Sequence, residues 1–542
     1  MPRYDMPRID TPTFPTAAVA APHEAAAQAG RAILIEGGNA VEAMIAMAAT
    51  IAVVYPHMNG IGGDAFWCVA EPNGRVHAID AAGFAGTHAT PGFYHARDRD
   101  SVPTRGPLAA LTVPGTVDGW RLAGELARAR GGRLPLATLL SDAIRRAREG
   151  VPVSGSESRL WAGAKGPNDR AALEEAPGFR DTFFVDDAPP EAGAVRRFPK
   201  LADTLAYLAE AGLRDFYEGD VGREIATGLE RIGAPVTRAD LRRFEARTVR
   251  PLGLRLPGVE IFNLPPPSQG LASLAILGIA ERLALGRPDT VSWHHGLIES
   301  VKRAFAIRDR VVRDPGLVDD DPQDLLADAV LAREAAAISM SRAAPWPPGG
   351  GEADTVWMGA IDKDGLAVSF IQSLYWEYGS GCVLPETGVL LQNRGAAFSL
   401  ARDAANPLAP GRKPFHTLNP PIARFTDGRV VAYGCMGGDG QPQTQAQVLA
   451  RYRAGASPAE AVDAPRWLLG RTWGETSTSL KLEARVDESL VVGLRRLGHR
   501  VEVLDAPYSD TLGHAGLLVK HPGDGRVLAT HDPRSDGAAL GS

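Results

Sequence analysis

The chain has 542 residues, of which 44% are hydrophobic and 23% charged, a balance typical of a soluble globular protein. Its formal net charge is −6 and it has no basic stripe, which argues against a nucleic-acid partner. The longest apolar run, residues 43–55, is too short to cross a bilayer, and the N-terminus lacks the pattern of a secretory signal. Three cysteines without metal-ligand spacing suit a reducing compartment, so we expect a cytoplasmic protein with no membrane partner.

Helical periodicity dominates roughly the first 340 residues. The clearest amphipathic runs cover residues 25–51, 139–148 and 292–312. Within residues 67–80 the pattern changes to strand, turn and strand, with Pro72-Asn73-Gly74 as the turn, which predicts a hairpin. No internal repeat of solenoid length is present.

The last third of the chain is richer in predicted strands. Residues 356–362 and 366–375 flank Asp364-Gly365, a favoured hairpin turn. Ser457 to Glu460 forms a capping box that starts a helix, and Pro465 ends it. Further strands are predicted at 388–391, 430–433, 480–482, 501–504 and 516–520. Helices between mixed strands indicate a layered α/β or α+β domain.

A junction in the middle of the chain carries the first chemical hypothesis. Residues 344–351 are rich in proline and glycine, so we expect them to be solvated and mobile. Thr355 follows and begins a predicted strand. Cleavage before Thr355 would expose an α-amino group, which titrates near 7.7–8.0 and can act as the base for the hydroxyl of the same residue. The alternative is that Thr355 merely begins a strand.

Two glycine-rich segments have a chemical and a purely structural interpretation. Residues 60–65 match a G-x-G-x-x-A dinucleotide fingerprint, but a strand-like run follows where that motif requires a helix, so a tight turn is favoured. Gly437 and Gly438 lie between a predicted strand and a predicted helix. Their N–H groups could stabilise an oxyanion, or they could form a plain turn. The sequence has no metal or nucleotide motif, so we expect no metal and no cofactor.

In order, and over nearly the whole chain, these segments resemble the γ-glutamyltranspeptidase family. The matching segments are residues 37–43, 59–63, 113–117, 355–365, 437–438 and 532–535. The resemblance implies an α+β fold, the four-layer αββα sandwich of N-terminal-nucleophile hydrolases. It also implies self-cleavage between Asp354 and Thr355 into a large subunit (1–354) and a small subunit (355–542), which together form one domain.

The same resemblance assigns four catalytic residues. Thr355 stands at the family's nucleophile position, and Ser373 stands where the family has a second threonine. Gly437 and Gly438 match the glycines of the family's oxyanion hole.

The family's glutamate-binding residues do not carry over. Ala82 stands at the position of the arginine that binds the substrate α-carboxylate, and Ala397 at that of the acid that binds the α-amino group. Tyr375 replaces a substrate-binding asparagine, and His416 and Thr417 replace a pair of serines. Charged hydrogen bonds contribute about 1.5–3 kcal/mol each, so losing both anchors argues against a γ-glutamyl substrate.

What replaces these anchors resembles the family's oxamate amidohydrolase and acylase branch. Loss of the acid with Arg394 and His416 nearby predicts a pocket for an anion, and oxamate has a carboxylate but no amino group. We therefore assign Arg394, Tyr375, His416 and Asn393 to substrate binding. The alternative for Arg394 is an ion pair with an acid such as Glu377 or Asp403, and for His416 a structural hydrogen bond.

The resulting hypothesis is a self-processing amidohydrolase that cleaves a small carboxylate-bearing amide, oxamate-like, or an acyl amide. Its partners would be that small molecule and the two subunits of one precursor, and a homo-oligomer is left open. One alternative is true γ-glutamyl hydrolysis or transfer with a substitute anchor such as Arg105. The others are a non-processing scaffold and, as the weakest, a dinucleotide oxidoreductase.

Overall fold

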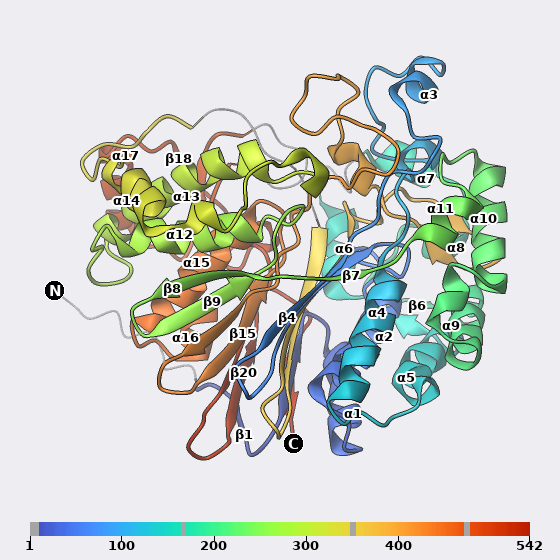
Figure 1. Ribbon diagram of the computed structural model, residues 1–542, viewed down its shortest axis with the longest axis horizontal. Coiled ribbons are helices and arrows are strands. Elements are labelled where there is room, and N and C mark those ends of the chain that lie inside the picture. Colours follow the sequence, from blue (N-terminus) through green and yellow to red (C-terminus); the bar gives the residue numbers. More distant parts are fainter. Residues whose placement is uncertain (1–9, 164–168, 347–353, 471–476) are drawn as a thin grey trace.

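The computed structural model describes residues 10–163, 169–346, 354–470 and 477–542. Two seven-stranded sheets form its centre, with helices on both sides (Figure 1). The predicted mobile segment at 344–351 lies largely outside the described residues. Among the described helices, none combines the length and the apolar character needed to span a bilayer. All three cysteines are buried, free thiols.

We call the two sheets sheet I and sheet II. In spatial order, sheet I consists of β1 (Thr13–Phe14), β20 (Val527–His531), β19 (Ala515–Lys520), β15 (Val430–Cys435), β14 (Ile422–Phe425), β9 (Val259–Asn263) and β8 (Leu252–Leu256). Sheet II consists of β21 (Ala538–Gly541), β2 (Ala18–Ala21), β10 (Asp354–Ile361), β11 (Ala367–Tyr375), β3 (Asp64–Ala70), β4 (Val76–Ala81) and β7 (Arg247–Val249). Each sheet therefore combines strands from both sides of the 354–355 bond.

An apolar layer joins the facing sides of the two sheets. Trp357 and Phe66 from sheet II pack in one buried cluster with Leu518 and Ile422 from sheet I. The indole nitrogen of Trp357 donates to Ser369 Oγ at 2.9 Å, so this buried N–H is satisfied within sheet II. This packing places β10 and β11 in the interior of the molecule.

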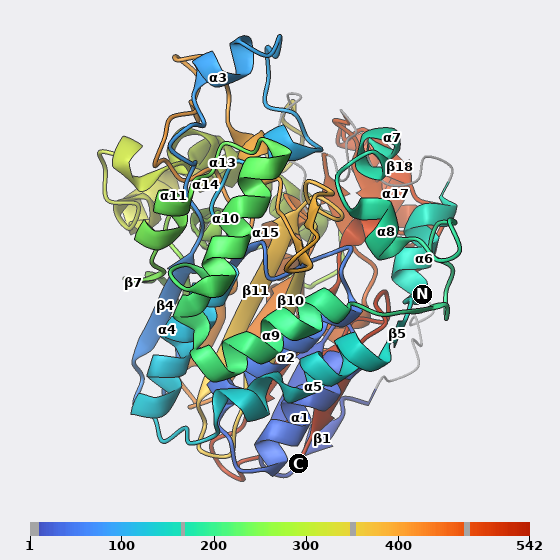
Figure 2. The ribbon, with the colours of Figure 1, turned by 90° about the vertical axis from the view of Figure 1, so that its right-hand side faces the viewer.

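Helices cover the outer face of each sheet (Figures 1 and 2). The core on the side of sheet II includes α1 (Glu24–Ile35), α2 (Ala40–Val54), α4 (Thr116–Ala129), α5 (Leu136–Glu149) and α9 (Pro199–Ala211). The core on the side of sheet I includes α12 (Gly270–Glu281), α13 (Val291–Val311), α14 (Asp328–Ala336), α15 (Gly440–Arg453), α16 (Pro458–Asp463) and α17 (Glu488–Arg496).

Smaller elements complete the described chain. The remaining helices are α3 (Pro91–His95), α6 (Gly155–Ala162), α7 (Arg170–Glu174), α8 (Phe179–Phe183), α10 (Asp220–Ile232) and α11 (Arg238–Arg243). The remaining strands are β5 (Val151–Pro152) with β6 (Val195–Arg196), β12 (Val383–Leu384) with β13 (Val389–Leu390), and β16 (Trp467–Leu469) with β17 (Leu480–Leu482) and β18 (Val501–Val503).

The predicted helical run over residues 25–51 is wrong in one respect, because the chain breaks there into α1 and α2. Gly37 adopts a φ of +87°, and Asn39 then caps α2 in a reciprocal capping box with Glu42. Every residue of α2 is buried, so this helix is apolar on all sides rather than amphipathic. It packs against β10 and β11, the strands that carry the candidate site.

Candidate active site

Thr355 lies near the start of β10 and is 1% exposed. The pairing of β10 with β11 shifts register here: residue 354 pairs with Tyr375, whereas Val356 pairs with Gln372. Such a bulge redirects side chains and is common beside active sites. Thr355 Oγ1 accepts a hydrogen bond of 3.4 Å from Gln441 Nε2.

Ser373 and Tyr375 lie on β11, opposite the part of β10 that carries Thr355. The Ser373 hydroxyl accepts from the Tyr375 amide at 2.8 Å and from Arg394 Nη2 at 3.4 Å. Tyr375 has a φ of +89°, which is rare for a residue with a bulky side chain. This turn of the backbone places the Tyr375 ring 4.1 Å from the guanidinium carbon of Arg394.

Arg394 begins a short 3₁₀ helix, Arg394–Ala397, and its side chain is fully buried. Its Nη1 donates to Thr417 Oγ1 at 3.3 Å, and no carboxylate of the described residues lies within ion-pair distance. Burial lowers the pKa of Arg394 to about 10. The ion pair with Glu377 that was considered as the alternative for Arg394 is absent, because Glu377 pairs with Arg105 at 3.3 Å instead.

His416 and Asp64 lie beside this guanidinium. His416 Nε2 is 3.2 Å from Asp64 Oδ2, and neither ring nitrogen has a hydrogen-bond partner among the described residues. Burial and the charge of Arg394 lower the pKa of His416 to about 4, so the ring is neutral at pH 7. The contact with the Asp64 carboxylate is of the structural kind considered as the alternative for His416.

The side-chain amide of Asn393 is used by the backbone around it. Its Oδ1 accepts from the Trp376 amide at 3.1 Å, and its Nδ2 donates to the Thr104 carbonyl at 2.7 Å. Asn393 thus fixes the loop that follows β11. Because both groups of its side-chain amide are bonded to backbone, Asn393 supports the loop next to Arg394.

Gly437 and Gly438 form the loop between β15 and α15, with φ values of +112° and +53°. No hydrogen bond from either amide is found among the described residues, which leaves both N–H groups available at the positive end of α15. The Gly438 carbonyl accepts from the Gln441 amide at 3.1 Å. Because the Gln441 side chain contacts Thr355, the glycine loop and the candidate nucleophile belong to one site.

Residues 26–542 match the family model described as gamma-glutamyltranspeptidase. The chain belongs to the gamma-glutamyltranspeptidase family. The predicted family is therefore confirmed, and so is the prediction of an enzyme.

Two relatives and one solved structure show where in the family the chain is similar. It is 50% identical over 523 residues to the oxamate amidohydrolase proenzyme of Klebsiella pneumoniae, covering 96% of this chain and 97% of that protein. It is 36% identical to the glutathione hydrolase-like YwrD proenzyme of Bacillus subtilis, covering 96% and 98%. The structure of cephalosporin acylase from Bacillus halodurans superposes with a TM-score of 0.90 at 32% identity, covering 100% and 98%. The predicted resemblance to the oxamate amidohydrolase and acylase branch is confirmed.

Two alanines, Ala82 and Ala397, stand at the positions where the resemblance places the family's charged glutamate anchors. Ala82 is buried in the apolar layer between the sheets, where it packs with Phe66. Ala397 ends the 3₁₀ helix of Arg394, and its carbonyl accepts from Asn406 at 3.1 Å. Neither position offers a charge to a substrate of this family member.

Three polar residues of the site escaped the sequence analysis. Asp64 directly follows the glycines of the motif that was interpreted as a turn, and its Oδ1 accepts from the Gly83 amide at 2.9 Å. Gln441 and Gln269 each contact the glycine loop. Amide side chains carry no sequence signal for such a role, whereas Asp64 could have been noticed because a carboxylate follows the turn directly.

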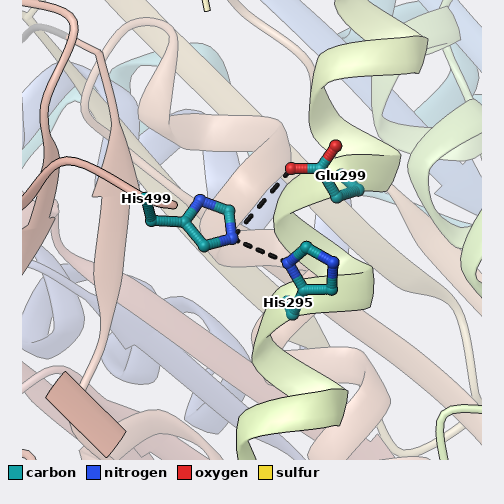
Figure 3. Close-up of side chains that lie close together, drawn as sticks. All are labelled: His295, Glu299 and His499. Carbon is teal, nitrogen blue, oxygen red and sulfur yellow. Dashed lines mark hydrogen bonds and ion pairs between the residues drawn. The ribbon is translucent and has the colours of Figure 1, made fainter. Parts of the chain in front are cut away.

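A second buried cluster contains residue types that can ligate metals: His295, Glu299 and His499 (Figure 3). His295 Nδ1 lies 2.7 Å from His499 Nε2, and His295 Nε2 lies 2.8 Å from the Ser339 carbonyl. Glu299 Oε1 accepts from Lys302 Nζ at 2.6 Å, so the ammonium already neutralises this carboxylate. Lys302 Nζ also donates to the Ala344 carbonyl at 2.6 Å, and the Ala344 amide donates to Glu299 Oε2 at 3.1 Å, so the cluster holds the backbone at Ser339 and Ala344.

Proposed function

We propose that this protein is a self-processing amidohydrolase that cleaves a small amide bearing a carboxylate next to the reacting carbonyl. The observation that carries the proposal is the fully buried guanidinium of Arg394, which has no carboxylate partner among the described residues. Asp64 acts on this guanidinium only from beyond ion-pair distance, and a substrate carboxylate would supply a counter-ion in direct contact.

The position of Arg394 favours a short substrate. Arg394 contacts the hydroxyl of Ser373, which lies on the strand beside Thr355. An anion bound there lies close to the nucleophile, as in oxamate, where the carboxylate is bonded directly to the amide carbon. The name of the Klebsiella relative, oxamate amidohydrolase proenzyme, supports the same substrate class.

We assign the proenzyme cleavage to the Asp354–Thr355 bond, which separates residues 1–354 from residues 355–542. Relatives named as proenzymes support this maturation. Both sheets combine strands from the two parts, so we propose that the parts stay together after cleavage as one αββα sandwich of the N-terminal-nucleophile type.

In the cleaved enzyme, the α-amino group of Thr355 takes the proton of its own hydroxyl as Oγ1 bonds to the amide carbon. The oxyanion accepts from the N–H groups of Gly437 and Gly438. The ammonium group of Thr355 then gives its proton to the amide nitrogen as the C–N bond breaks, and this nitrogen leaves as ammonia. Water attacks the resulting ester and gives one proton to the same amine. The bond between the acyl carbon and Oγ1 then breaks, Oγ1 takes that proton from the amine, and the acid is released.

A matched pair of substrates tests the proposal. Oxamate and oxamide have nearly the same shape, but only oxamate carries a carboxylate. We expect the wild type to prefer oxamate, and Arg394→Gln to lower kcat/KM for oxamate by about 10- to 100-fold, the loss expected for one charged hydrogen-bonded contact. Turnover of oxamide, where it is measurable, should change less than threefold. Equal losses for both amides would refute a carboxylate role for Arg394.

The second candidate function is γ-glutamyl hydrolysis or transfer, because the B. subtilis relative is named glutathione hydrolase-like. A panel of oxamate, glutaryl amides and γ-glutamyl-p-nitroanilide separates the two, and addition of glycylglycine distinguishes transfer from hydrolysis. Turnover of the γ-glutamyl compound alone would establish this second candidate. A chain that neither self-cleaves nor hydrolyses any of these amides would instead be a scaffold.

A further inference from the structure

Two buried side chains from the part before residue 354 meet the glycine loop of the site. Gln269 directly precedes α12, and Arg308 lies in the last turn of α13. Their relative exposures are 0% and 2%. Arg308 Nη1 donates to Asp439 Oδ1 at 2.8 Å, and Gln269 Nε2 donates to the Gly438 carbonyl at 2.9 Å. The loop is thus held from across the proposed cleavage boundary.

Every hydrogen-bonding group of the Gln269 side chain has a defined partner. Its Nε2 also donates to the Thr417 carbonyl at 2.8 Å, and its Oε1 accepts from Arg308 Nη1 at 3.2 Å. A guanidinium can only donate, so Arg308 requires Oε1 to face it. Arg308 therefore fixes the orientation in which both N–H groups of the Gln269 amide face backbone carbonyls.

The backbone of Gln269 strengthens this connection. Its amide donates to the His416 carbonyl at 2.9 Å, and the Ser268 hydroxyl donates to the Leu418 carbonyl at 2.6 Å. The segment before α12 is thereby joined to the loop of His416 and Thr417. Because Thr417 Oγ1 accepts from Arg394, Gln269 contacts both the glycine loop and the loop that orients the guanidinium.

The glycine loop needs such support. Gly437 and Gly438 both have positive φ values, and glycine has the widest conformational freedom of any residue. Oxyanion stabilisation depends on donors that already point to the correct place before the reaction. Bonds to the Gly438 carbonyl fix the peptide plane that follows Gly438 and restrict the rotation of the N–H groups before it.

We propose that Gln269 and Arg308 are positioning residues of the oxyanion loop, with Arg308 orienting the Gln269 amide that holds the Gly438 carbonyl. The inference rests on the proposed function for the role of the loop. Gln269 also supports the substrate-anchoring loop through Thr417, so its loss affects both kcat and KM. Loss of Arg308 affects chiefly kcat.

Two conservative variants and one matched control test this proposal. Gln269→Glu keeps the shape of the side chain but replaces the two N–H donors by acceptors. Arg308→Lys keeps the charge opposite Asp439 but loses the planar fork. The control is Arg451→Lys, because the buried Arg451 also pairs with an acid across the boundary, the exposed Asp289 at 2.8 Å, but at the far end of α15.

We expect kcat for oxamate to fall at least tenfold in Gln269→Glu and Arg308→Lys and less than twofold in Arg451→Lys. Inhibition by oxalate, which has the carboxylate but no amide, should change less than twofold in Arg308→Lys. The melting temperatures of Arg308→Lys and Arg451→Lys should both fall, because each variant loses a buried guanidinium. If kcat stays within twofold of the wild type in both test variants, or falls equally in the control, the positioning role is refuted.

Hydrogen exchange of the peptide spanning residues 436–441 decides the question independently of activity. The test variants should exchange these amides at least tenfold faster than the wild type, and the control should not. If the wild type hydrolyses no amide of the panel, the proposed function fails, and this measurement still reports on the loop. Unchanged exchange in both test variants would overturn the inference by itself.

Discussion

The Arg394 guanidinium carbon lies 4.1 Å from the centre of the Tyr375 ring, and Tyr375 maintains this contact with a backbone φ of +89°. The strained backbone is stabilised by the bond from the Tyr375 amide to Ser373 Oγ at 2.8 Å. Strain of this kind persists only where the surroundings hold it in place, and it concentrates at functional sites. The aromatic face thus fixes one side of the proposed anion site.

Removal of that face should weaken substrate binding. We expect Tyr375→Leu to raise KM for oxamate about 3- to 30-fold, because a desolvated cation–π contact contributes roughly 0.5–2 kcal/mol. Tyr375→Phe keeps the ring and should change KM less than threefold. Steady-state kinetics on both variants make the comparison, and an unchanged KM in Tyr375→Leu would show that the ring does not help to hold Arg394.

Maturation should depend on the hydroxyl of residue 355. Thr355→Ala should remain one chain of 542 residues and hydrolyse no amide, because both steps need Oγ1. Thr355→Ser retains a hydroxyl and should still cleave, although more slowly. Intact-mass measurement of the wild type and both variants gives the answer directly. Cleavage of the alanine variant before residue 355 would place the nucleophile elsewhere.

The turn before β3 should tolerate no side chain at Gly63. A Cβ there would lie 2.1 Å from the Ser373 carbonyl oxygen, and a contact with backbone cannot be relieved by a rotamer change. We expect Gly63→Ala to destabilise the fold by roughly 1–3 kcal/mol or more and to reduce activity by moving β11. The control is Gly523→Ala, because a Cβ at Gly523 would have no atom within 4 Å. Its melting temperature should equal that of the wild type.

Acid should destabilise the fold partly through His57. Burial lowers the pKa of His57 to about 4, and neither ring nitrogen has a hydrogen-bond partner among the described residues. Below pH 6.5 the unfolded state binds a proton that the native state refuses until about pH 4. The free energy of unfolding therefore falls as pH drops through this window, by about 1.4 kcal/mol per unit, and is unaffected above it.

Denaturant unfolding at pH 7.5, 6 and 5 checks this expectation with a His57→Gln variant. The pH dependence of that variant should be smaller by the contribution of one proton. Other histidines with lowered pKa values, among them His23, His416 and His499, should maintain their own contributions. His88→Gln, at an exposed position, should keep the wild-type slope. Identical slopes for the wild type and His57→Gln would contradict the assignment.

Local structure could be predicted well because its causes are local. The hairpin of β10 and β11 forms at Asp364-Gly365, and the box of Ser457 and Glu460 begins α16 as expected. The tight turn expected at residues 60–65 is confirmed by the backbone contacts of its glycines, and β3 follows it where the dinucleotide motif requires a helix. Backbone propensity and side-chain caps act within a few residues, so the sequence shows them directly.

The motifs also predicted the family, because their order along the chain and the spacing of Thr355, Gly437 and Gly438 can be read from the sequence directly. Which charges pair could not be predicted in the same way. An ion pair with Glu377 was considered for Arg394 and not for Arg105, whereas the fold pairs Glu377 with Arg105 and leaves Arg394 without a carboxylate in ion-pair distance among the described residues. Ion pairing depends on distances of a few ångströms between distant segments, which the order of residues does not encode in a readable form.

Tertiary structure likewise decided which polar side chains surround the candidate site. Asp64, Gln269 and Arg308 come from three separate segments, and each reaches the site only after the sheets and helices have packed. The sequence by itself determined the strands, the turns and the candidate nucleophile, since these depend on neighbouring residues. The packing of distant segments decided which polar groups are buried together, because hydrogen bonds and charges act only between atoms that the fold brings into contact.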